Sequence, residues 1–156
     1  MSLIAAGTGT AETPLEELAN NGFWPAVSPT EFRDVQRIDG TVTDARLLHA
    51  LRVAMADVNR QLADYQLEQQ AEGIATVAEI PLEPWHIEGH HAQLYRRAVY
   101  SQAHAELLER YRDVSATAEG DERGEAKDLA ADDVRADARW AIAELTGRTH
   151  TTVELI

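Results

Sequence analysis

Three of the six histidines in this chain lie in the stretch HIEGHH, at 86–91, together with a glutamate. Imidazole nitrogens are common zinc ligands, and His86 and His90 are four residues apart, so both would share one face of a helix. Gly89 interrupts such a helix, however, and no glutamate follows His86 directly, so the zinc-protease pattern H-E-x-x-H is absent. No spacing indicates a third ligand. We therefore interpret the stretch as a polar helix entrance, with a metal-dependent hydrolase as the alternative.

The remaining sequence contains no other recognisable catalytic constellation. There is no cysteine, so thiolate chemistry and disulfides are excluded. No serine lies in a G-x-S-x-G turn, and the GTGT stretch lacks the preceding strand that a phosphate-binding loop needs. Carboxylates are numerous, but nothing indicates a pocket that would shift the pKa of one of them. We predict that the protein is not an enzyme and uses no metal or other cofactor.

Composition and charge limit the possible partners. The chain has 156 residues, enough for one domain with its own core, and a formal net charge of -13. So acidic a surface repels nucleic acid, which argues against sequence-specific DNA binding. No basic region is followed by a long apolar run, and no apolar stretch reaches the length of a membrane span. We expect no membrane partner, and assembly in the cytosol.

The periodicity of apolar residues is helical throughout, and alternating strand-like runs are nearly absent. Ser28 and Thr43 are good N-cap residues for two of the helices. We predict an all-α fold, a small bundle of about four helices at about 29–37, 43–73, 88–113 and 130–146. A flexible acidic N-terminal arm (1–22), with a short helical turn at TPLEELA, precedes the helical domain (23–147), and an extended C-terminal tail (148–156) follows it.

Two regions of the predicted bundle differ from ordinary amphipathic helices. The helix expected at 88–113 is apolar on two sides, with Tyr100 and Tyr111 on the second, so it should be central in the bundle or lie between subunits. Residues 114–128 show no period and predict a solvated loop. The range from Asp113 to Asp137 contains nine acidic and three basic residues, which gives a local net charge of -6.

Aromatic and apolar residues near the C-terminal end are candidates for a partner interface. Trp140 falls opposite the core stripe of its helix, so it is either covered by the chain itself or an anchor for a partner. The tail RTHTTVELI is rich in β-branched and apolar residues, and it either folds back over Trp140 or docks on another chain. The candidate interface residues are Trp140, Tyr100, Tyr111, Val153, Leu155 and Ile156.

Three stretches resemble a known family. They are FWPAVSPTEFRDVQRIDGTVTDARLLHALRVAMADVNRQLADYQ, LYRRAVYSQAHAELLERYRD and DVRADARWAIAELTGRTHTTVELI. Together, from about Phe23 to Ile156, they resemble the head completion protein of contractile-tailed temperate double-stranded DNA phages. The HIEGHH stretch departs most from that pattern. The family has no catalytic signature, which agrees with the absence of one here.

The resemblance implies a structural virion protein at the head–tail neck, which closes or extends the portal after DNA packaging. By its likeness in fold to portal-adaptor proteins, it implies a ring of twelve copies. The implied partners are the chain itself, the portal protein and a tail-terminator or neck protein, with packaged DNA passing through without sequence-specific binding. In that setting we expect the acidic residues Asp121, Glu122 and Glu125 to face the DNA channel.

An acidic helical binding module is the alternative from a different class of function. Such a protein would mimic DNA or capture a host factor, as a monomer or dimer. Its acids should then form phosphate-like rows, whereas here they are concentrated in one segment.

Overall fold

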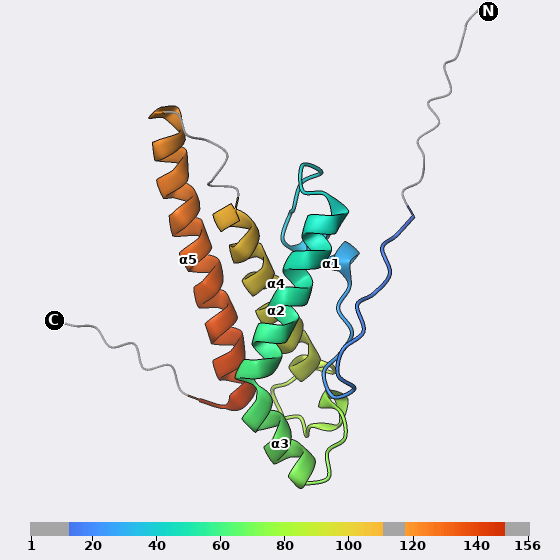
Figure 1. Ribbon diagram of the computed structural model, residues 1–156. Coiled ribbons are helices and arrows are strands. Elements are labelled where there is room, and N and C mark those ends of the chain that lie inside the picture. The colour runs from blue at the N-terminus through green and yellow to red at the C-terminus, as the bar shows by residue number, and fades with distance from the viewer. Residues whose placement is uncertain (1–12, 111–117, 149–156) are drawn as a thin grey trace, which may run out of the picture.

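The computed structural model describes residues 13–110 and 118–148, with the backbone alone described over 118–129. Its elements are α1 (Pro29–Val35), α2 (Asp44–Gln61), α3 (Ala63–Ala71), the 3-10 turn η1 (Val77–Glu79), α4 (His90–Arg110) and α5 (Ala118–Thr146) (Figure 1). Within these ranges the only β pairing is an isolated bridge between Leu18 and Val27. The structure therefore confirms a small all-α bundle.

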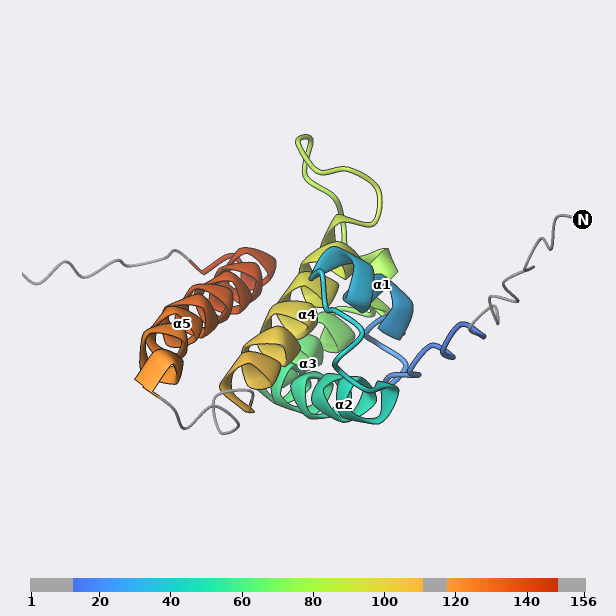
Figure 2. The same ribbon diagram turned by 90° about the horizontal axis from the view of Figure 1, so that it is seen from above.

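Helix α4 is the centre of the bundle. Figure 2 shows it between α5 on one side and α1 and α2 on the other. Ten of its residues are buried, on both sides of the helix, and several of them are small, such as Ala98, Ala103 and Ala105. Its two apolar sides thus each cover a neighbouring helix of the same chain, which explains the unusual pattern in the sequence.

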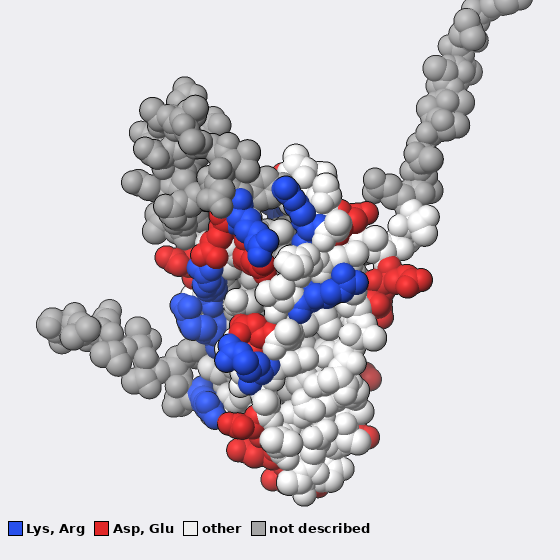
Figure 3. Space-filling model, viewed as in Figure 1, with Lys and Arg blue, Asp and Glu red and all other residues white. Residues whose placement is uncertain are grey.

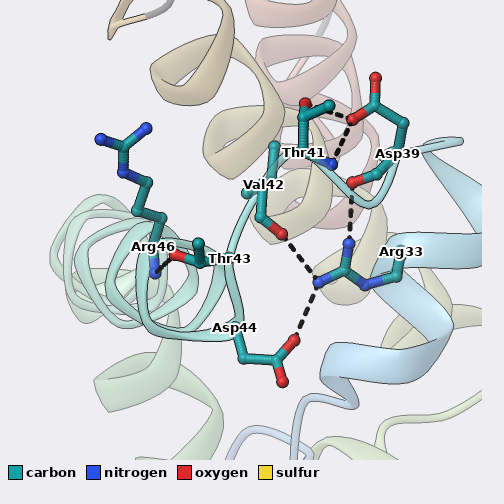
Figure 4. A network of polar contacts seen from close by, with 7 residues as sticks. All are labelled: Arg33, Asp39, Thr41, Val42, Thr43, Asp44 and Arg46. Carbon is teal, nitrogen blue, oxygen red and sulfur yellow. Dashed lines mark hydrogen bonds and ion pairs between the residues drawn. The ribbon is translucent and has the colours of Figure 1, made fainter. Parts of the chain in front are cut away.

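The first two helices begin where the capping residues predict. The Ser28 hydroxyl accepts a hydrogen bond from the Glu31 N–H at 3.1 Å, and the Thr43 hydroxyl accepts one from the Arg46 N–H at 3.4 Å. Arg33 on α1 fixes the connection between the helices (Figure 4). Its guanidinium donates to the Asp39 carbonyl, the Val42 carbonyl and the Asp44 carboxylate, at 2.9, 3.2 and 3.0 Å.

The single long helix expected at 43–73 is two helices. Leu62 separates α2 from α3, with φ and ψ of -98° and 6°, and its side chain is fully buried. The bend directs α3 toward the N-terminal segment, where Tyr65 stacks near Trp24. Periodicity did not reveal the break, because the apolar spacing continues across it.

The prediction of a loop at 114–128 is also wrong for most of that range. Helix α5 begins at Ala118, so Asp121, Glu122 and Glu125 lie in a helix and not in a loop. Alanine, glutamate and arginine are strong helix formers, and they form a helix here without an apolar stripe to indicate it.

The described part of the N-terminal arm, 13–22, lies against the domain and has no helical turn at TPLEELA. Leu18 and Val27 exchange backbone hydrogen bonds of 2.8 and 3.0 Å, and the side chains of Leu15 and Leu18 pack on the core. Among the described helices, none is long and apolar enough to cross a membrane.

Candidate functional site

The three histidines of HIEGHH form one packed cluster at the start of α4. The rings of His86 and His90 stack with their centroids 4.0 Å apart, and His91 meets them edge-on at 5.2 and 5.7 Å. His86 Nδ1 accepts a hydrogen bond from the Glu83 N–H at 3.1 Å. His90 Nε2 is buried 3.4 Å from the Glu144 carboxylate on α5, a contact without hydrogen-bond alignment.

This packing does not resemble a metal site. Ring nitrogens coordinate a metal through lone pairs that lie in the ring plane. The rings of His86 and His90 are stacked and nearly parallel, so their lone pairs lie in two separate planes and do not converge on one point. Among the residues the structure describes, no group of three or more His, Cys, Asp or Glu side chains is arranged to hold a metal ion. What the cluster does in this geometry is attach the preceding loop to α4 and α5.

The cluster makes the stability of the protein depend on pH. Burial lowers the pKa of His91 below its ordinary value of 6.5, and the neighbouring His86 and His90 lower that pKa further. Burial also lowers the pKa of His104, which contacts Gln36. Below about pH 6.5 the unfolded chain therefore binds more protons than the folded chain, so the free energy of unfolding should fall as the pH decreases.

We expect the urea midpoint to be lower at pH 5.5 than at pH 7.5, and His91→Gln to reduce that difference. Glu144 faces His90 across the cluster, but its side chain is 54% exposed, so solvent screens its charge. A midpoint that stays constant or rises on acidification would contradict the prediction. The His104 contribution should remain in the variant as residual pH dependence.

The loop that the histidines hold, 81–89, exposes three large apolar side chains. Leu82 is 47% exposed, Trp85 is 75% exposed and Ile87 is 64% exposed. Figure 2 shows the connection between η1 and α4 projecting away from the helices. Grouped exposed apolar residues of this kind mark interaction sites. Our interpretation of the sequence missed them, although three large apolar residues in a proline-containing connection were a visible signal.

A groove lies between the N-terminal end of α2 and the C-terminal end of α4. Its volume is about 320 Å³, and its apolar lining comes from Ala45, Ala50 and Leu107. Charged or titratable side chains also line it, namely Arg46, His49, Glu106 and Arg110. The groove and the projecting loop are therefore at opposite ends of α4.

The comparison with known families covers almost all of this structure. The sequence profile described as phage head completion protein (GPL) matches residues 18–156. The chain belongs to this family. It is 33% identical to the head completion/stabilization protein of Escherichia phage P2, over 97% of this chain and 92% of that protein. It is 28% identical to the probable head completion/stabilization protein of Haemophilus phage HP1 (strain HP1c1), over 89% of this chain and 91% of that protein. No solved structure gives a significant match.

In this structure, Tyr100 is not available to a partner. Its ring is 3% exposed and packs on Phe32, and its hydroxyl donates to the Glu31 carboxylate at 2.7 Å. Burial, followed by the Glu31 carboxylate, raises the pKa of Tyr100 well above its usual range. This corrects the assignment of Tyr100 to a partner interface, because the second apolar side of α4 covers α1 of the same chain.

The other predicted site residues are either partly exposed or outside the described part of the chain. Trp140 on α5 is 52% exposed, which leaves half of its surface accessible. The side chains of Asp121, Glu122 and Glu125, and the whole of Tyr111, Val153, Leu155 and Ile156, lie outside the described residues. Their roles stay predictions.

Proposed function

We propose that this protein is a structural component of the virion that completes and stabilises the DNA-filled head, as a ring between the portal and the tail. The observation that carries the proposal is the family match over 18–156. That range contains every described helix, so the role named for the phage P2 relative would come with the whole helical domain. We place the protein at the head–tail neck, after assembly in the host cytoplasm.

The proposed partners are further copies of the chain, twelve in the ring, together with the portal protein and a tail-terminator or neck protein. The net charge of -13 supports a channel through which packaged DNA slides without adhering. Asp121, Glu122 and Glu125 would contribute to that channel from the first part of α5, in place of the loop we expected.

The described surface gives little support to the alternative of a DNA mimic or host-factor binder. On the face in Figure 3, arginines are interspersed with the acids. Several arginines in the described part of the chain pair with carboxylates of the same chain, as Arg97 does with Asp137 at 3.1 Å. A DNA mimic needs acids in uninterrupted rows, and the described residues on this face form none.

Inactivating the gene in the phage that carries it tests the proposal. We expect DNA-filled heads that lose their DNA or fail to join tails, and therefore a loss of infectious particles. Supplying the wild-type chain from a plasmid should restore them, which is the control for effects on neighbouring genes. Normal yields of tailed, DNA-filled particles without the chain would contradict a role in head completion.

A further inference from the structure

The projecting loop 81–89 combines apolar and acidic side chains. Trp85 and Ile87 are exposed between Glu83 and Glu88, and neither glutamate pairs with a cation among the described residues. The surrounding sequence is also acidic. Residues 61–95 contain six acidic residues and no lysine or arginine. A partner for this loop therefore needs an apolar surface bordered by positive charge.

The loop is held in one shape before any partner arrives. The His86 N–H donates to the Glu83 carbonyl at 2.9 Å, and His86 Nδ1 accepts from the Glu83 N–H at 3.1 Å. The stack of His86 on His90 then ties this turn to α4. Because the loop is already ordered, docking it costs less conformational entropy than docking a flexible segment.

The groove between α2 and α4 has the complementary character. Its apolar lining is bordered by Arg46, which pairs with no carboxylate in the described part of the chain, and by Arg110. Arg110 pairs with Glu106, another groove residue of its own helix, at 2.9 Å, with side chains that are 66% and 19% exposed, so part of the Arg110 charge is neutralised within the copy. Arg46 is thus the groove cation with its charge available to a partner.

We propose that loop 81–89 of one copy docks in the α2–α4 groove of the next copy, an inference that rests on the proposed role as an assembling virion protein. The loop precedes the first residue of α4, and the groove lies at its last turn. The 21 residues of α4 separate them by about 30 Å, so the two surfaces of one copy do not meet. Because the loop and the groove are different surfaces, each copy can use its loop on one neighbour and its groove on the other. Such a contact forms a closed ring when the rotation between successive copies adds up to a full turn.

Site-directed disulfide formation tests this contact directly, because the natural chain contains no cysteine. We would mix Ile87→Cys and Ala45→Cys proteins at high concentration, and separately oxidise virions that carry both substitutions in one chain, so that Trp85 stays in place. The mixture should give a crosslinked dimer that exceeds the yield from either variant alone, and the virions should give a ladder of oligomers. Leu67→Cys, on the equally exposed Leu67 of α3, replaces Ile87→Cys in the matched control and should give no such product.

A charge exchange then tests the recognition. Arg46→Glu or Glu83→Arg alone should reduce the crosslink several-fold at low salt, and the two variants together should restore it. Trp85→Ala, at a residue too exposed to affect folding, should weaken self-association roughly 30-fold, the effect of losing one aromatic hot spot.

The outcomes separate this contact from the proposed function. If neither the mixture nor the virions form the Ile87–Ala45 product, the docking contact is wrong, whereas the role in head completion depends on the gene-inactivation result alone. If Ala45→Cys instead crosslinks to Val153→Cys, the groove receives the C-terminal segment, and the loop proposal is likewise overturned.

Discussion

Replacing Trp24 with alanine should lower the free energy of unfolding by about 3–5 kcal/mol, the range for removing a large aromatic side chain from a core. Trp24 is 3% exposed and stacks on Tyr95 with the ring centroids 4.9 Å apart and the planes 8° apart. Phe23 meets its edge at 4.8 Å, and Tyr65 stacks at 6.4 Å. The indole thus joins the N-terminal segment to both α3 and α4.

Chemical denaturation with two variants as controls distinguishes this effect from the general cost of losing a tryptophan. Trp85→Ala removes the same side chain from a position that is 75% exposed, and should change stability by less than about 0.5 kcal/mol. Trp24→Phe should cost clearly less than Trp24→Ala, because the buried indole N–H has no hydrogen-bond partner among the described residues. Equal losses at Trp24 and Trp85 would show that the stack does not stabilise the fold.

Enlarging Ala141 to leucine should destabilise the protein by about 1–3 kcal/mol through overpacking. Ala141 is fully buried on α5, and Ala138 beside it is 3% exposed. Helix α5 packs chiefly on α4, where Ala98 and Ala105 are equally buried, so small side chains on both helices allow a close approach. A leucine at this interface must push the two helices apart or leave its preferred rotamer.

Guanidinium chloride unfolding measures the loss, and Arg139→Leu supplies the matched control. Arg139 is exposed on the same helix, so the same new side chain there meets no neighbouring helix. The prediction fails if Ala141→Leu unfolds at the same denaturant concentration as Arg139→Leu, since that would mean the interface has room for three more carbon atoms.

The features that the sequence predicted correctly depend on neighbouring residues. Ser28 and Thr43 cap α1 and α2 through contacts with residues three positions along, and Gly147 follows the last residue of α5 with a positive φ of 66°. The two apolar sides of α4 indicated a place either at the centre of the bundle or between subunits, and the structure has the helix at the centre. The family was also recognisable, because its pattern extends along most of the chain, and the match over 18–156 confirms it.

Contacts between distant parts of the chain decided which side chains are buried and which of them meet. The Tyr95 hydroxyl bonds to Asn59 and Asn20, 36 and 75 positions away, and Tyr100 is buried by α1 some 70 positions earlier. The histidines of HIEGHH share a cluster because Glu144 of α5 and the loop turn meet them at the start of α4. Capping and periodicity report only a few residues at a time, so they cannot show which side chain covers which. The tertiary structure alone therefore placed Tyr100 inside the core, Trp85 outside it, and the histidines in a packed cluster.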